Sequence, residues 1–319
     1  MPARRPWVRG GDGGGAPPDP QHFSGKNDGV AARISGAATA EGATALTATA
    51  VGIDFEDGTA ALAEAEEISV KIYRTASGAV PTFEVTHGES TLTYGPGHAP
   101  DRRNYRVRSA DGEETGGRWT WAGYPVDHAN GVFVGEDGDI GIKRGKYLIP
   151  MGFWYDTETA NPLRNAVIGL RTPPGDMPTQ DVTAFYEGDV RLQAREAEDS
   201  RDRIELDSDI LLEASFAEGT VSGTLDGWRR KIFRGDESLS DERLDGVVYV
   251  IPETDITGNG FAGTLAEGAN CVGCAEDITA TVNGGFYGPY AEEAGGTIRG
   301  TYTDGGVDHV IAGIFYANR

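Results

Sequence analysis

The chain has 319 residues, of which 50 are acidic and 28 are basic, so its formal net charge at pH 7 is −22. Such an acidic surface repels phosphate backbones and anionic lipids, which excludes nucleic acid as a natural partner. The 47 glycines, the 16 prolines and the lack of long helical periodicity favour an all-β chain of two domains. No apolar stretch reaches the roughly 18 residues of a membrane-spanning helix, so no transmembrane segment is predicted.

The first segment, residues 1–28, is rich in glycine and proline around "GGDGGGAPPDP". It has a basic head but lacks the apolar centre of a signal peptide. Its composition is typical of a disordered tether.

Residues 29–174 alternate short strand patterns with turn signals, as in "EEISVKIYRTASG" and "GKYLIPMGFWYD". They are predicted to form a β-rich domain that ends at the proline-rich segment 171–180. Its tryptophans Trp119, Trp121 and Trp154 are candidates for a ligand-binding face. Rings in strands are more often part of a core, so both interpretations stay open.

Residues 175–319 show a clean two-residue period, which predicts eight strands. These strands lie within the segments 181–194, 209–217, 219–227, 245–253, 260–268, 277–285, 296–306 and 308–319. Eight antiparallel strands with one apolar face close into an up-and-down β-barrel with a filled core. Tyr302 and, in the last strand, the alternate residues Val310, Ala312, Ile314 and Tyr316 are expected inside, with Arg299 and Thr301 outside.

The segment "GGFYGPYAEEAGG", residues 284–296, carries the acidic pair Glu292 and Glu293. Gly-Pro ends a strand, and "YAEEA" suits one helical turn before the next strand. Adjacent carboxylates on such a turn point about 100° apart and do not converge on one bond. The segment is therefore predicted to be a barrel corner rather than a catalytic loop.

The two cysteines, Cys271 and Cys274, lie in a glycine-rich turn without further ligands for zinc. Either a small disulfide loop or two free thiols accounts for them, and a disulfide is predicted if the chain is exported. The acidic clusters Glu136–Asp139 and 198–209 could supply oxygens to Ca²⁺, but they match no known calcium loop, so solvated turns are favoured. No catalytic or cofactor motif occurs, so neither an enzymatic activity, a metal nor a cofactor is predicted.

The barrel segments also carry a family resemblance. The order "GNGFAGTL", "ITATVNGGFYGP" with "AEEAGGTI", and "IAGIFYANR", preceded by "VTAFYEGDVRL", resembles the C-terminal barrel of transferrin-binding-protein-B-like bacterial surface lipoproteins and their solute-binding relatives. The match covers about residues 175–319, and residues 29–174 resemble only loosely the β-rich handle domain that precedes the barrel in that family. The chain has one handle-plus-barrel unit in place of paired lobes. No lipid-acceptor cysteine precedes the tether, which would place a lipid anchor upstream of Met1.

The resemblance implies a non-enzymatic extracytoplasmic protein at the bacterial cell surface. It would bind a host protein, an iron source or another solute through its loops. The loop 228–244 and the handle supply the candidate contacts, namely Trp228, Arg229 and Arg230 with Trp119, Trp121 and Trp154. The alternative is a structural role in an acidic surface layer, appendage or self-assembling particle decorated by the barrel.

Overall fold

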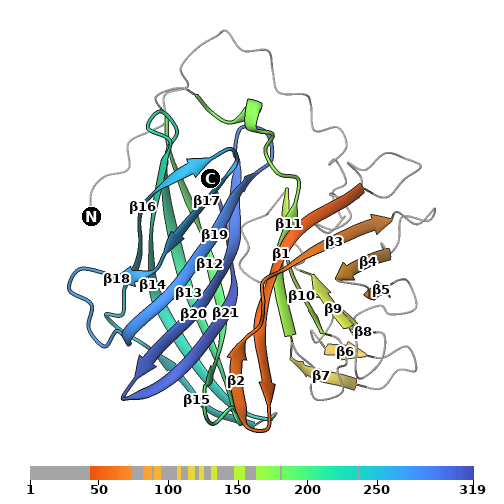
Figure 1. The fold of residues 1–319 in the computed structure, drawn as a ribbon, viewed down its shortest axis with the longest axis vertical. Helices are drawn as coiled ribbons and strands as arrows, with labels where there is room; N and C mark the ends of the chain where they lie inside the picture. Colours follow the sequence, from red (N-terminus) through yellow and green to blue (C-terminus); the bar gives the residue numbers. More distant parts are fainter. Residues whose placement is uncertain are drawn as a thin grey trace.

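The computed structural model describes the following residues: 44–73, 82–87, 90–94, 106–108, 114–118, 122–125, 131–134, 147–154, 163–179, 182–235 and 237–319. The described residues form mainly β-strands, and a 3₁₀ turn at Pro174–Asp176 lies between β11 and β12. Among these residues, no helix combines the length and hydropathy of a membrane span. Figure 1 shows two β layers side by side, an open sheet and a barrel.

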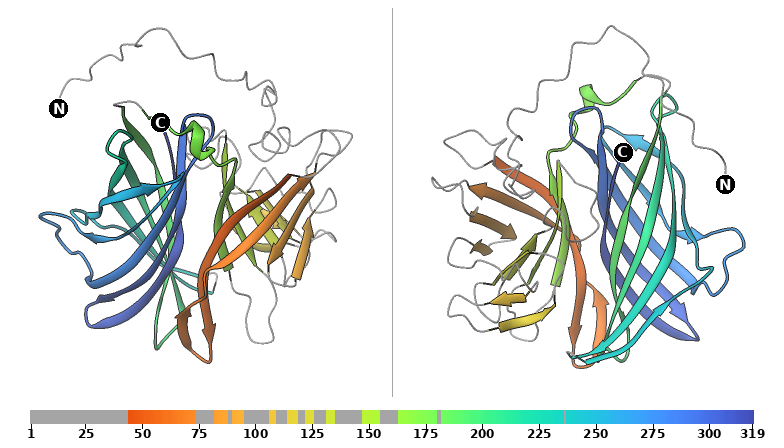
Figure 2. Two further views of the ribbon diagram at one scale, coloured as in Figure 1. Left: turned by 45° about the horizontal axis from the view of Figure 1, so that its top comes forward. Right: turned by 180° about the vertical axis from the view of Figure 1, so that it is seen from behind.

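The open sheet, here called the handle sheet, is antiparallel and has the strand order β5-β4-β3-β1-β11-β10-β9-β8, with β2 paired to β1. Its strands are β1 (Thr44–Glu56), β2 (Thr59–Leu62), β3 (Glu66–Tyr73), β4 (Thr82–His87), β5 (Ser90–Tyr94), β8 (Ala122–Pro125), β9 (Gly131–Val134), β10 (Leu148–Trp154) and β11 (Leu163–Gly169). A separate hairpin joins β6 (Arg106–Arg108) to β7 (Glu114–Arg118). In Figure 2 the handle sheet curls like half a barrel.

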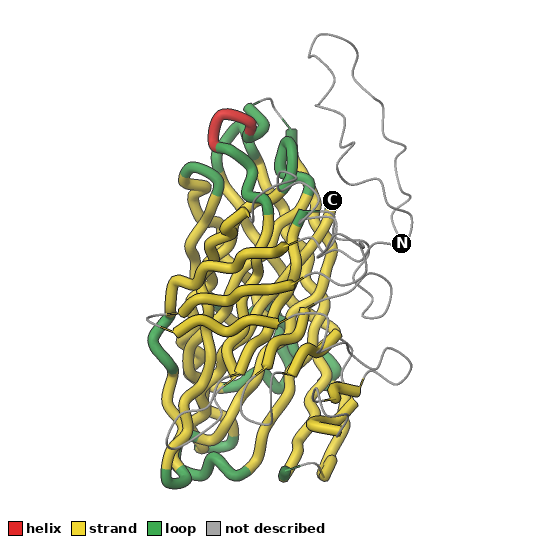
Figure 3. The backbone as a smooth tube through the Cα atoms, turned by 90° about the vertical axis from the view of Figure 1, so that its right-hand side faces the viewer, coloured by secondary structure: helices red, strands yellow, loops and turns green. Residues whose placement is uncertain are grey.

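The second sheet closes into an eight-stranded antiparallel barrel, as predicted from the sequence. Its strands are β12 (Thr183–Glu196), β13 (Asp202–Ser215), β14 (Thr220–Arg234), β16 (Tyr249–Thr257), β17 (Gly260–Thr264), β19 (Glu276–Tyr287), β20 (Glu293–Asp304) and β21 (Val307–Asn318). Each strand pairs with the next one in this series, and β21 pairs with β12. Two short strands lie outside this closed series: β15 (Glu237–Arg243) pairs with β14, and β18 (Ala266–Glu267) pairs with β16. The long tilted strands are visible from the side in Figure 3.

One end of the barrel is filled by aromatic side chains, here called the aromatic plug. Neighbouring rings have centroids 5.5 to 6.2 Å apart, close enough for tilted and edge-to-face contacts. The plug consists of Tyr186, Phe216, Phe261, Phe286 and Phe315. The Tyr186 hydroxyl donates a 2.6 Å hydrogen bond to the carbonyl oxygen of Ala291, which fixes the plug to the corner after β19.

Glycine is required where neighbouring strands approach most closely. A Cβ at Gly188 would lie 2.0 Å from the carbonyl oxygen of Tyr316, and one at Gly300 would lie 2.1 Å from that of Thr279. Any side chain would force the two backbones apart. These glycines therefore let the strands coil tightly around a narrow core.

The last strand, β21, faces inward with the opposite set of residues from the one predicted. Ile311, Phe315 and Ala317 belong to the barrel core, whereas Val310 and Ala312 pack against handle residues of β1 and β2. Ile314 and Tyr316 lie on the same face as Val310 and Ala312, so they too point out of the barrel, and the Tyr316 hydroxyl accepts a 3.2 Å hydrogen bond from Arg191 Nε. The prediction for this strand was wrong because β21 is buried on both faces, so the apolar residues do not alternate.

In β20 the prediction was right. Tyr302 is 8% exposed and belongs to the barrel core, whereas Thr301 is exposed. The alternation is readable there because the end of β20 has solvent on its outer face. When one face of a strand meets solvent, the alternation of polar and apolar residues predicts which side chains point inward. When both faces are buried, it does not.

The corner at residues 284–296 joins the barrel to the handle. Glu293 is 3% exposed, and its Oε2 accepts hydrogen bonds of 2.9 Å from the backbone N–H groups of Tyr147 and Leu148. A side-chain hydrogen bond links Tyr147 to Glu292. Burial and these carboxylates raise the pKa of Tyr147 to about 12. The acidic pair therefore clamps the two parts together, beyond shaping a corner.

The predicted helical turn at this corner is absent from the structure. Gly288, Pro289, Tyr290 and Ala291 form a tight turn instead, with φ values of 58° at Tyr290 and 56° at Ala291. Left-handed residues of this kind end regular structure rather than begin a helix. The turn directs Glu293 into the start of β20, where it can reach the handle.

Candidate functional site

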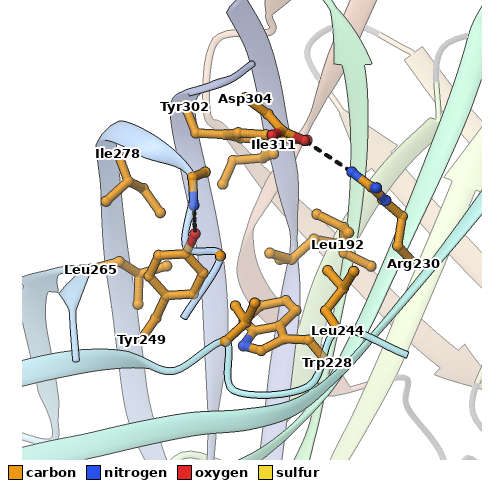
Figure 4. Close-up of a pocket in the computed structure, with 14 residues that line it drawn as sticks. Leu192, Trp228, Arg230, Leu244, Tyr249, Leu265, Ile278, Tyr302, Asp304 and Ile311 are labelled. Carbon is orange, nitrogen blue, oxygen red and sulfur yellow. Dashed lines mark hydrogen bonds and ion pairs between the residues drawn. The ribbon is translucent and has the colours of Figure 1, made fainter. Parts of the chain in front are cut away.

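The end of the barrel opposite the aromatic plug, here called the mouth, contains a cavity of about 150 Å³ (Figure 4). At this end β12, β14, β17 and β20 finish while β13, β16, β19 and β21 begin. The wall is mostly apolar and includes Leu192, Leu206, Leu244, Val247, Leu265, Ile278 and Ile311. Apolar side chains therefore face inward at this end of the barrel too, but they leave a space unfilled.

Two aromatic rings form one corner of the cavity. Trp228 and Tyr249 meet edge to face, with centroids 5.7 Å apart and planes at 90°. The Trp228 ring nitrogen donates to the carbonyl oxygen of Leu225 at 3.3 Å, and the Tyr249 hydroxyl oxygen accepts from the backbone N–H of Ala275 at 2.8 Å. Both rings are therefore held in place by backbone groups as well as by packing.

A small disulfide loop forms another part of the wall. Cys271 and Cys274 are joined by a disulfide, and their Cα atoms lie 5.9 Å apart. The backbone N–H of Val248 donates to Cys271 Sγ at 3.2 Å, which ties the loop to the start of β16. Gly273 and Ala275 of the loop face the cavity. The loop therefore presents a fixed surface to whatever enters.

The rim of the cavity carries a compensated positive charge. Arg230 lies between two carboxylates, with Nε 2.7 Å from Glu242 Oε1 and Nη1 2.9 Å from Asp304 Oδ2. Burial alone would lower the pKa of Arg230, but the hydrogen bonds and charges of the two carboxylates outweigh it and raise the pKa. Arg230 stays charged, and its two carboxylate partners leave one negative charge in excess at the rim.

Tyr302 lines the cavity next to this rim. Its ring stacks on His309 with centroids 4.7 Å apart and planes at 5°. Burial and the charge of Asp304 raise the pKa of Tyr302, so the phenol keeps its proton at neutral pH. The cavity wall therefore combines apolar side chains with a neutral hydroxyl.

An antiparallel sheet segment, here called the arm, forms one side of the mouth and carries an additional outer strand. It consists of residues 202–207 of β13, residues 229–234 of β14 and strand β15. Ion pairs hold it together across the strands. They join Arg229 to Asp241 at 2.5 Å, Arg234 to Asp202 at 2.8 Å and Lys231 to Asp207 at 3.1 Å. Most of the predicted loop 228–244 is thus paired strand, and residues 202–209 of the predicted acidic turn belong to β13.

The structure places the predicted contact residues at different points. Trp228 is 3% exposed and part of the cavity wall, Arg230 is at its rim, and Arg229 lies on the arm. Trp119 and Trp121 fall outside the described residues, as does the side chain of Trp154 in β10. Trp228 and Arg230 are therefore brought together at the mouth.

Tyr249 and Asp304, which complete the mouth, were not predicted from the sequence. Tyr249 lies at the start of β16 in "DGVVYVIPE", and Asp304 ends β20. Both stand at strand ends in the structure, although Tyr249 lies in the middle of the predicted segment 245–253. Strand ends that share one rim of a barrel are the signal that could have found them.

One cluster in the described part of the chain has its ligand atoms close enough for a metal ion. It consists of Glu267, Cys271 and Cys274, whose ligand atoms lie within 4.8 Å of one another. The disulfide occupies both sulfurs, which leaves a single carboxylate. The acidic cluster Glu136–Asp139 lies outside the described residues.

The barrel matches a known family model. Residues 177–319 match the model of the C-lobe and N-lobe beta barrels of Tf-binding protein B. A comparison with curated proteins finds no match.

Among solved structures, a mutant of the vaccine antigen transferrin-binding protein B from Haemophilus parasuis is 19% identical, with a TM-score of 0.38. The match covers 85% of this chain and 60% of that one, so the chain spans about 60% of its length. The isotype 1 protein from serogroup B Neisseria meningitidis is 18% identical over 82% of this chain and 56% of that one, with a TM-score of 0.34. A structure described as a surface lipoprotein is 12% identical over 85% of this chain and 98% of that one, with a TM-score of 0.36.

Proposed function

Because residues 177–319 form a barrel of the Tf-binding protein B type, we propose that the chain is a non-enzymatic surface protein that binds another protein. It acts outside the cytoplasm, on the bacterial surface. The barrel mouth with its arm is the contact surface. The aromatic handle residues Trp119 and Trp121 are proposed as further contacts.

The arm is the observation that carries this proposal. The eight barrel strands close without β15, so this outer strand of the arm is not needed to complete the barrel. Its outer strand, β15, is exposed along most of its length and offers Leu239, which is 45% exposed. Paired arginines and carboxylates hold the surface in one shape, which lowers the entropy lost on binding.

The chemistry of the mouth supports binding rather than catalysis. Its charged groups, Arg230, Glu242 and Asp304, are engaged with one another. Tyr302 and Tyr249 keep their protons because burial raises the pKa of each. Such an arrangement provides shape and hydrogen bonds but no activated base or nucleophile.

The proposal is tested with one arm variant and a matched control. The arm variant combines Arg229→Ser with Leu239→Ser. The control, Leu211→Ser, removes a leucine of similar exposure, 43%, from the outer barrel wall. Each immobilised protein is exposed to serum and to purified iron-loaded transferrin, and the retained proteins are identified and titrated.

We expect wild type and Leu211→Ser to retain the same protein with equal affinity, and the arm variant to bind it at least about tenfold more weakly, a loss of about 1.4 kcal/mol. Equal binding by all three proteins would move the contact surface away from the arm. If wild type retains nothing and electron microscopy shows ordered assemblies, the structural alternative replaces this proposal.

A further inference from the structure

We infer that the cavity at the barrel mouth is a binding site for a small neutral molecule that has one ring and one hydrogen-bond-accepting oxygen. This site is the interior of the mouth, so it adjoins the protein-binding surface proposed above and shares Arg230 of the arm with it. Its ligand is recognised by the cavity wall, whichever protein the arm contacts.

The size and lining of the cavity set the class of guest. A volume of about 150 Å³ suits a molecule of one ring, since apolar cavities of about this size are known to take up benzene. Leu192, Leu265, Ile278 and Ile311 come from four different parts of the barrel and surround the space (Figure 4). A flat apolar guest would bury most of its surface there.

The aromatic corner favours a ring over an alkyl chain. Trp228 and Tyr249 stand at right angles, 5.7 Å apart. A guest ring can stack on one of them while it meets the edge of the other, and both arrangements are favourable. Backbone hydrogen bonds hold the two rings in place, so the corner exists before the guest arrives.

The hydroxyl groups of the wall define the polar end of the guest. In the described part of the chain, the Tyr302 hydroxyl makes no hydrogen bond. The Tyr249 oxygen accepts from Ala275, which leaves its own proton to donate. Two neutral O–H donors suit an acceptor oxygen such as that of a ketone or an ether.

Charge at the rim argues against an anionic guest, and the apolar wall argues against any charged guest. Arg230 is paired with both Glu242 and Asp304, so it has no charge left to compensate an anion. A cation would have to compete with Arg230 for the same carboxylates. Moving any charged guest into the apolar wall would also cost desolvation without a partner.

The test uses acetophenone, which has a ring and a carbonyl oxygen, and toluene, which lacks the oxygen. Binding to the full chain is measured by ligand-observed NMR and by calorimetric titration. Tyr302→Phe removes one hydroxyl, and Ala275→Phe places a ring in the cavity, with Ile278→Trp as a second filling variant. Leu211→Ser is the control, and circular dichroism checks that each variant is folded.

We expect wild type and Leu211→Ser to bind acetophenone more tightly than toluene. Tyr302→Phe should weaken acetophenone about tenfold, which corresponds to one hydrogen bond of about 1.4 kcal/mol, and leave toluene unchanged. A folded filling variant should lose both ligands. Failure of wild type to bind either probe, or undiminished binding by a folded filling variant, would overturn the inference, as would equal weakening of both probes by Tyr302→Phe.

Discussion

Removing the Glu293 carboxylate should destabilise the chain, because this buried side chain bonds the barrel to the handle. Its Oε2 accepts two buried backbone N–H groups, those of Tyr147 and Leu148, each at 2.9 Å. In Glu293→Ala both donors lose their acceptor at a site that is 3% exposed. An unsatisfied buried donor costs about 1–3 kcal/mol, so the expected loss in the free energy of unfolding is about 2–6 kcal/mol.

Glu293→Gln removes the negative charge but keeps an oxygen that can accept hydrogen bonds. Its amide oxygen can still accept both bonds, but the bonds to a neutral group are weaker than those to a carboxylate by about 1 kcal/mol each. We expect a loss of about 2 kcal/mol, between wild type and alanine. Glu213→Ala, on the exposed wall of β13, is the matched control and should change stability by less than about 0.5 kcal/mol.

The assay is urea unfolding followed by circular dichroism and by tryptophan fluorescence, with calorimetry to detect separate transitions. The handle and the barrel should unfold together in wild type and less cooperatively in Glu293→Ala. If Glu293→Ala and Glu213→Ala have equal midpoints and slopes, the clamp contributes nothing and the reasoning fails.

Three further outcomes are expected. Ile314→Ala should cost about 2–5 kcal/mol in urea unfolding because Ile314 is 1% exposed between barrel and handle, whereas Thr301→Ala should cost less than about 0.5 kcal/mol; equal costs would contradict the register of β20 and β21. Replacing Cys271 and Cys274 with serine should cost about 2 kcal/mol or less because the closed loop is very short, and a larger loss of melting stability would give the disulfide a greater role. Burial raises the pKa of Tyr186, so the Tyr186 hydroxyl loses its proton at a lower pH in the unfolded chain than in the folded one. The free energy of unfolding should therefore fall as pH rises above about 10, and full phenolate absorbance before unfolding would contradict this.

The barrel could be predicted from the sequence wherever one face of a strand meets solvent. In β12 and β13 polar residues alternate with Ala184, Tyr186, Ile210 and Leu212, so the inward face is visible without a structure. The run "HVIAGIFYAN" of β21 contains no such contrast because the handle covers its outer face. A continuous apolar run is itself the sign of a strand buried on both faces.

The arm and the clamp were harder to predict because their residues serve long-range partners. Arg229 and Arg234 are polar in sequence, which resembles a loop, but their carboxylate partners lie on neighbouring strands. Glu293 looks like half of an exposed acidic pair until Tyr147, 146 residues away, supplies the amide that it binds. Only tertiary contacts distinguish these roles from solvated turns.

The mouth was predicted in part. Trp228 and Arg230 were chosen because they begin a polar segment after a strand, and the structure brings them together around the cavity. The cavity itself depends on what the inward side chains fail to fill. The unfilled volume depends on the inward side chains and the tilts of all eight strands, and no local sequence pattern determines these together.

Hydrogen exchange of the full chain with and without its captured protein partner is the most direct test of the binding surface. The backbone amides of residues 229–243 should be protected in the complex, while the β13–β14 turn beside the aromatic plug, residues 217–219, should exchange as in the free chain. Protection at residues 217–219 with unchanged exchange in the arm would contradict the account and place the partner at the plugged end.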